Sequence, residues 1–181
     1  MSQVIEFQDF PKIARLSREV IITEKIDGTN AQIFIGDNGE FLVGSRTKWI
    51  TPESDNYGFA KWAYEHRDEL MQLGSGRHFG EWWGQGIQRG YGLKEKRFSL
   101  FNTIRWAEAR PGCCGIVPVL WQGIFSTVMV DQCMSQLIAL GSVAAPGFMK
   151  PEGVVVYHVA ANMGFKKTLE KDESPKSMIK D

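Results

Sequence analysis

A lysine between acidic residues is the most chemically suggestive feature of this sequence. Residues 23–30 read TEKIDGTN and follow a run of β-branched residues, so a strand here would place Lys25 on the same face as Asp27. A lysine directed inward from a strand needs an acidic partner or a chemical role. One reading is a structural ion pair with Asp27 or Glu24. The other is a nucleophilic amine, which needs nearby cations or a metal to favour its neutral form.

Groups that could assist such a lysine lie far from it in sequence, at the ends of predicted strands. Arg46 follows a predicted hairpin, and the pair Lys166-Lys167 comes late in the chain. Glu81 lies within the segment FGEWW, and Glu152 comes shortly before an apolar run. Separated cations and carboxylates around a glycine-lined cleft suit a nucleotide and a divalent metal.

The elements that must position these residues are mostly strands. Residues 20–26, 30–35 and 41–45 predict three successive strands, with a hairpin turn at 37–40 where Asn-Gly accepts positive φ. Their short connections favour an antiparallel sheet over a parallel one. Further strands are expected at residues 77–83, 98–104, 116–125, 154–159 and 164–168.

Two helices complete the predicted elements, at residues 57–73 and 128–140. In the first, apolar residues recur at spacings of three and four, and His66 on this stripe is read as a core or boundary residue. Gly141 is expected to end the second helix. Together with the strands, these helices predict a single α+β domain.

Composition excludes several classes of protein. The chain has 181 residues, of which 43% are hydrophobic, so intrinsic disorder as the main state is excluded. Its 21 basic and 21 acidic residues cancel, which argues against a polybasic protein that binds nucleic acid by bulk charge. Residues 111–149 carry one charge, Asp131, and are expected to supply much of the core, with a buried strand pair favoured over a membrane span. Three cysteines are read as reduced thiols of a soluble, cytoplasmic protein.

The zero net charge hides an uneven distribution. Residues 1–80 hold 9 basic and 12 acidic residues, whereas residues 81–110 hold 6 basic and 3 acidic ones. The basic run in this second segment could face phosphates, or it could be a solvated loop. Its members are Arg89, Lys94, Lys96, Arg97 and Arg105.

The motifs resemble those of the covalent nucleotidyltransferases, which comprise ATP-dependent DNA and RNA ligases and mRNA capping enzymes. Lys25-Ile26-Asp27-Gly28 resembles their K-x-D-G motif, which is weak alone but stronger as the first of an ordered series. The other members of the series are residues 45–47, 79–88, 98–103, 152–155 and 165–166. The sequences of residues 23–30 and 79–88 are most similar to those of RNA ligases that seal nicks in duplex RNA.

This resemblance implies a fold and a set of catalytic residues. The fold would be one nucleotidyltransferase (ATP-grasp-like) domain of antiparallel sheets flanked by helices, spanning residues 1–168, with a polar, mobile tail at 169–181. Lys25 would attack the α-phosphate of ATP to form lysyl-AMP. Lys166 would offset charge on the phosphates, and Glu152 would organise Mg²⁺ or Mn²⁺ as the metal ligand.

The resemblance also implies a nucleotide-binding set. Arg46 would contact the sugar, Glu81 would bind the ribose hydroxyls, and Phe101 would either stack on adenine or serve as a plain core residue. The full set is Glu24, Lys25, Asn30, Arg46, Glu81, Phe101, Glu152, Lys166 and Lys167.

Two features depart from the family pattern. The late motif of the family carries lysines one residue apart, but position 168 is Thr168 and the second lysine is the adjacent Lys167. On a strand, Lys167 points away from Lys166 unless a bulge turns it inward. Larger members also carry a C-terminal domain that engages nucleic acid, so an accessory protein could replace it here.

These observations predict an ATP-dependent RNA ligase that joins a 5′-phosphate to a 3′-hydroxyl, with RNA ends as the preferred partner. The basic run at residues 89–105 would hold phosphates near the AMP site. A minimal DNA ligase is the alternative within the same chemistry, and a capping guanylyltransferase is less favoured. A nucleotide- or RNA-end-binding module with weak or no catalysis is the alternative from another class.

Overall fold

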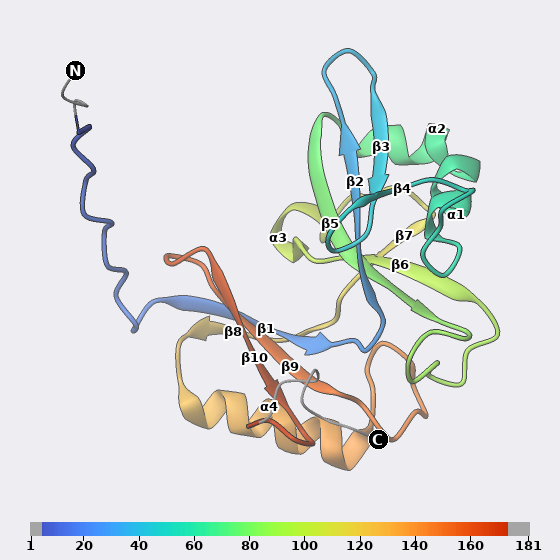
Figure 1. The fold of residues 1–181 in the computed structure, drawn as a ribbon. Coiled ribbons are helices and arrows are strands. Elements are labelled where there is room, and N and C mark those ends of the chain that lie inside the picture. The colour runs from blue at the N-terminus through green and yellow to red at the C-terminus, as the bar shows by residue number, and fades with distance from the viewer. Residues whose placement is uncertain (1–4, 174–181) are drawn as a thin grey trace.

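The computed structural model describes residues 5–173 and contains two β-sheets (Figure 1). The smaller sheet has four strands in the order β10-β9-β1-β8, and all its neighbours are antiparallel. Its strands are β1 (Glu19–Lys25), β8 (Val119–Ile124), β9 (Gly153–His158) and β10 (Met163–Thr168).

The larger sheet has six strands in the order β4-β3-β2-β5-β6-β7. Only the pair β6–β7 at one edge is parallel. Its strands are β2 (Thr29–Ile35), β3 (Phe41–Gly44), β4 (Trp49–Ile50), β5 (Gly76–Gly84), β6 (Lys96–Leu100) and β7 (Cys114–Ile116).

Each sheet has its own helices (Figure 1). The long helix α4 (Thr127–Leu140) packs on the smaller sheet and ends at Gly141, whose φ of 80° is available to glycine at little cost. The larger sheet is accompanied by α1 (Phe59–Glu65), α2 (Arg67–Leu70), a 3₁₀ turn η1 (Met71–Leu73) and α3 (Thr103–Trp106).

Three apolar clusters follow from this arrangement. One lies under α1 and α2, and a second lies between α4 and the smaller sheet. The third joins the two sheets, and its buried members are Ile26, Trp83, Tyr91, Val117 and Ala145. Because Ile26 and Val117 are where the chain crosses between sheets, this third cluster sets how one sheet meets the other.

The α+β fold with antiparallel sheets is confirmed, but three details of the prediction are wrong. The first predicted strand does not join the next two in one sheet, since β1 pairs with β8 and β9. The strand expected over 98–104 ends at Leu100 and is followed by α3. The strand expected over 116–125 divides at Val117-Pro118 into β7 and β8, which lie in different sheets, and edge strand β8 is largely exposed rather than buried.

The helix expected over 57–73 is also interrupted, because His66 leaves helical geometry between α1 and α2. Its ring Nδ1 lies 2.8 Å from the carbonyl oxygen of Trp62, so it is a half-buried boundary residue, as the pattern predicts. The described start of the predicted tail is tied to the domain, since the N–H of Leu169 donates to Glu152 O at 2.9 Å. Residues 174–181 of that tail lie outside the described residues. None of the helices in residues 5–173 is long and apolar enough to cross a bilayer.

Candidate functional site

Lys25 and Glu152 meet where strands β1 and β9 lie side by side. Lys25 ends β1 and pairs in register with Gly153, the first residue of β9. Its Nζ lies 2.7 Å from Glu152 Oε2. The Lys25 side chain is 21% exposed and that of Glu152 only 3%, so the amine is held by a buried carboxylate yet remains partly accessible to solvent. Lys25 therefore pairs with Glu152, and not with Asp27 or Glu24, the partners expected for a structural ion pair.

Gly153 is a requirement of this pairing. Its φ of 150° is rare for residues with side chains, and a Cβ there would run into the backbone carbonyl of Lys167. Glycine thus allows β10 to approach β9 closely beside Glu152.

Glu81, on strand β5 of the larger sheet, lies close enough to Lys25 to interact with it electrostatically. Its Oε1 accepts the N–H of Gly28 at 3.0 Å, and its Oε2 accepts Asn30 Nδ2 at 3.3 Å. Burial raises the pKa of Glu81 to about 7, against the opposing attraction of Lys25. The site therefore holds a carboxyl that titrates near neutral pH next to the amine.

The turn after Lys25 packs tightly on strand β5. A Cβ at Gly28 would collide with the carbonyl oxygen of Trp82 and lie 2.7 Å from Trp83 Cβ. The glycine of the K-x-D-G motif therefore lets the backbone N–H reach Glu81, which links the lysine-bearing segment to the larger sheet.

Arg89 and Tyr91 complete the contacts around this turn. The sequence predicted Arg89 only as part of a phosphate-holding run and did not point to Tyr91. Arg89 Nε lies 2.9 Å from Asp27 Oδ2, and its Nη1 donates to Lys150 O at 3.0 Å. The hydroxyl of Tyr91 accepts the N–H of Asp27 at 2.7 Å. The cluster of glycines between positions 84 and 92 was the available signal for a loop that approaches the motif closely.

The two adjacent lysines of β10 point to opposite faces of the smaller sheet. Lys166 pairs with Val155, which pairs with Thr23, so it shares the face of Lys25. Lys167 lies on the other face, where its Nζ is 2.7 Å from Asp131 Oδ1 on α4. The regular ladder excludes the bulge that would have turned Lys167 inward, so its expected place in the nucleotide set is not supported.

Glu24 also faces away from Lys25. Its buried carboxylate accepts the hydroxyl of Ser142 and the backbone N–H groups of Val143 and Ala144, the latter two at 2.8 and 2.9 Å. This side chain anchors the loop after α4, and the expected nucleotide contact of Glu24 stays a prediction.

Two expected nucleotide contacts lie at the rim of the larger sheet. Arg46 is exposed in the bend between β3 and β4 and makes no side-chain hydrogen bond within residues 5–173. Phe101 follows β6, with its N–H donating to Phe79 O at 3.0 Å, and is 40% exposed. This exposure argues against the plain core alternative. Phe79 beside it is equally accessible and was not anticipated as a site residue.

Most of the basic run at residues 89–105 is engaged within the protein. Besides Arg89, Lys96 donates to Tyr57 O, Arg97 pairs with Glu95, and Arg105 donates to Leu73 O. Lys94 alone among the five makes no hydrogen bond or ion pair with a described residue. Lys96 and Arg105 keep their positive charge, because their acceptors are uncharged carbonyls, and the role of the run in holding phosphates stays a prediction.

The carboxylates suit a metal that is shared with phosphates. Residues 5–173 contain no group of three or more His, Cys, Asp or Glu side chains placed to hold a metal ion. Mg²⁺ needs no such cage, because it usually takes one or two carboxylates and completes its shell with waters and phosphate oxygens. Buried Glu152, with its carboxylate toward Lys25, fits that requirement.

The site thus joins a reachable amine, a buried carboxylate, a second carboxyl near neutrality and an exposed aromatic side chain. Once it has lost its proton, an amine in this position can attack a phosphorus atom, and the remaining groups can bind a nucleoside. This combination agrees with the comparisons with known proteins.

Structural comparison finds the same fold in RNA ligases. A mutant Naegleria gruberi RNA ligase with ATP and Mn matches with a TM-score of 0.62 and 19% identity, over 86% of this chain and 51% of that one. Another mutant, with AMP and Mn, matches with a TM-score of 0.60 and 19% identity, over 84% and 50%. The chain therefore spans about half the length of these proteins. A comparison with curated protein sequences gives no match.

Sequence comparison identifies the family directly. The RNA ligase family model matches residues 18–177, nearly the whole chain, including every motif named above. This chain belongs to the RNA ligase family.

Proposed function

We propose that this protein is an ATP-dependent RNA ligase that works through a covalent adenylate on Lys25. The observation that carries the proposal is the Lys25–Glu152 pair at 2.7 Å, in which Lys25 is partly exposed and also interacts with the buried carboxyl of Glu81. The fold similarity to ligases solved with ATP or AMP and Mn supports the choice of nucleotide and of a divalent metal. Family membership favours RNA over DNA ends.

In the first step, the neutral amine of Lys25 attacks the α-phosphorus of ATP. The bond from this phosphorus to the bridging oxygen breaks, pyrophosphate leaves, and a lysyl-AMP phosphoramidate forms. Glu152 orients the amine through its hydrogen bond. Lys166, on the same face, offsets negative charge on the phosphates.

In the next two steps, a 5′-phosphate oxygen of RNA attacks the adenylate and frees Lys25. A 3′-hydroxyl then displaces AMP and forms the phosphodiester. Mg²⁺ or Mn²⁺, held by Glu152, would neutralise phosphate charge. We assign Glu81 and Asn30 to the ribose, Phe101 to adenine, and exposed Arg46 to the sugar and the substrate end.

Three free cysteines and the need for ATP support a cytoplasmic location for this activity. The adenylyltransferase unit would span residues 1–168, and an accessory protein could supply further contacts with RNA.

The test is self-adenylylation. The protein, incubated with α-labelled ATP and Mg²⁺, is expected to acquire a covalent label that Lys25→Ala abolishes. Lys150→Ala, which removes a lysine outside the Lys25–Glu152 pair, should retain the label. A wild-type protein that binds ATP yet stays unlabelled would favour the non-catalytic binding module. Sealing of nicked duplexes that differ in one terminal 2′-hydroxyl then decides between RNA and DNA.

A further inference from the structure

The described part of the N-terminal segment carries three closely spaced cations that have no partner among residues 5–173. Lys12, Arg15 and Arg18 recur at every third residue, and no acidic residue lies between positions 10 and 18. All three are exposed, and no side chain among them makes a hydrogen bond or ion pair with residues 5–173. These cations are therefore available to an anionic partner.

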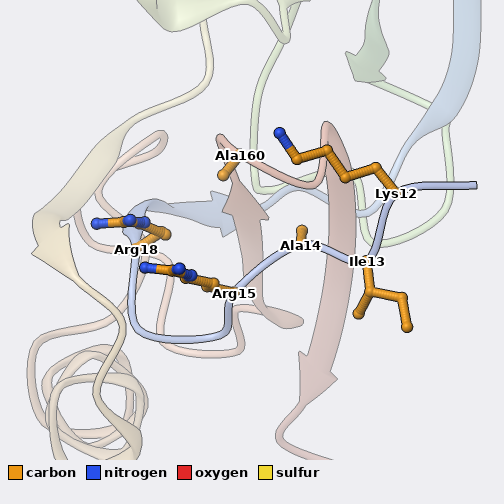
Figure 2. Close-up of a pocket in the computed structure, with 6 residues that line it drawn as sticks. All are labelled: Lys12, Ile13, Ala14, Arg15, Arg18 and Ala160. Atoms are coloured by element: carbon orange, nitrogen blue, oxygen red, sulfur yellow. The ribbon is translucent and has the colours of Figure 1, made fainter.

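The three side chains surround one hollow rather than scattering over the surface. Together with Ile13, Ala14 and Ala160 of the β9–β10 turn, they line a space of about 470 Å³. Figure 2 shows Arg15 and Arg18 pointing the same way and Lys12 extending toward Ala160. A net charge of +3 around a hollow of this size suits polyatomic anions.

The end of this segment is fixed to the smaller sheet. Buried His158 places its Nε2 2.9 Å from Leu16 O, and the N–H of Phe125 donates to Arg18 O at 2.9 Å. Arg18 therefore has a defined position relative to β1, whose opposite end carries Lys25. Seven strand residues at about 3.3 Å each place the two ends about 20 Å apart.

We propose that residues 12–18, which we call the basic arm, bind the phosphate backbone of the RNA on which the Lys25 site acts. The proposal rests on the proposed function, because it places the arm on the substrate of that site. A separation of about 20 Å is long enough to span several nucleotides of an RNA strand. The arm would thus hold RNA away from the ends being joined, without reading its sequence.

The basic arm also carries exposed apolar side chains, which a protein partner could cover in place of RNA. Ile13 is 79% exposed and Leu16 is 65% exposed. A second copy of the chain could cover them. In a protein interface Lys12, Arg15 and Arg18 would need acidic partners. The arm of a second copy contains no acidic residue to pair with them, so we favour RNA.

Binding is measured by fluorescence anisotropy with a nicked RNA duplex that carries a 5′-hydroxyl at the nick, so that no ligation follows. Arg15→Gln/Arg18→Gln is expected to weaken binding at least tenfold at 100 mM KCl. Each lost phosphate contact should also reduce the slope of log affinity against log salt by about 0.7–0.9. Self-adenylylation with ATP alone should stay within twofold of wild type.

The matched control is Lys61→Gln/Lys171→Gln, which removes the same charge from two exposed lysines outside the arm and the 89–105 run and should leave RNA affinity within twofold. Equal affinity of the wild type and the arm variant overturns the inference, even if ATP still labels Lys25. A dimer that Arg15→Gln/Arg18→Gln converts to monomers without loss of RNA affinity overturns it as well. Failure of ATP labelling with intact, arm-dependent RNA binding instead rejects the proposed ligase activity alone.

Discussion

At the scale of single residues, Glu81 shows how burial changes the chemistry of an ordinary carboxyl group. The residue is 7% exposed, and its ionised form pays a desolvation cost that two hydrogen bonds and Lys25 only partly offset. Glu152 and Asp27 oppose ionisation further. The pKa of Glu81 therefore rises from 4.5 to about 7.

This shift predicts a pH-dependent stability. The native carboxyl keeps its proton up to about pH 7, whereas the unfolded chain releases it near pH 4.5. The free energy of unfolding should therefore fall as pH rises from 4.5 to 7 and level off above, by on the order of 3 kcal/mol. Urea unfolding at pH 5 and pH 8, without nucleotide, measures the change.

Glu81→Gln should remove most of this dependence, while exposed Glu65→Gln should retain it. Identical pH profiles for the wild type and Glu81→Gln would contradict the assignment of the titration to Glu81.

At the scale of elements, strand alternation decides which lysine of β10 serves the site. Lys166 shares the Lys25 face, and Lys167 pairs with Asp131 on the α4 side. That pair is weak by nature, because both side chains are largely exposed, at 43% and 65%. One step along a strand therefore separates a phosphate-facing cation from a surface ion pair.

Alanine substitutions on β10 test this difference. We expect Lys166→Ala to lower the rate of self-adenylylation at least tenfold, because it removes positive charge from the phosphates. Lys167→Ala should lower the rate less than twofold and cost less than about 1 kcal/mol of stability. Comparable losses in both variants would show that β10 does not follow the observed register.

At the scale of the whole molecule, the site depends on how the two sheets meet. Lys25 and Glu152 belong to the smaller sheet, whereas Glu81 belongs to the larger one. Arg89, in the loop between β5 and β6, reaches across to Asp27 and to the carbonyl of Lys150. It therefore ties a loop of the larger sheet to both segments that carry the Lys25–Glu152 pair.

Removal of this tie should affect the reaction more than the binding of ATP. Arg89→Met is expected to lower the maximal rate of self-adenylylation at least tenfold, with a smaller change in the apparent KM for ATP. Arg89→Lys should restore part of the rate, because one ammonium can keep the Asp27 contact but not both hydrogen bonds. The control Arg97→Met removes an exposed ion pair with Glu95 and should change the rate less than twofold. A loss confined to KM would contradict a positioning role.

Much of the site could be predicted because its signals are local. Runs of β-branched and apolar residues define the strand that ends at Lys25 and the strand that follows Glu152, and the K-x-D-G segment places a lysine at the end of a strand. Local patterns do not identify the partners of a side chain. The sequence therefore did not decide which face of β10 carries Lys167, whereas the pairing of β10 with β9 and the contact with Asp131 do.

The sequence by itself determined the residue types that perform the chemistry, the order of the motifs and most of the strands, since these depend on neighbours within a few positions. The tertiary structure decided which charges are paired. Lys25 meets Glu152 across 127 positions, and Arg89 meets Asp27 across 62. Within residues 5–173, four of the five cations in the run at 89–105 have hydrogen-bond or ion-pair partners, whereas Lys12, Arg15 and Arg18, in the acidic first 80 residues, have none. Which charged side chains remain unpaired depends on packing between distant segments, so it cannot be deduced from composition.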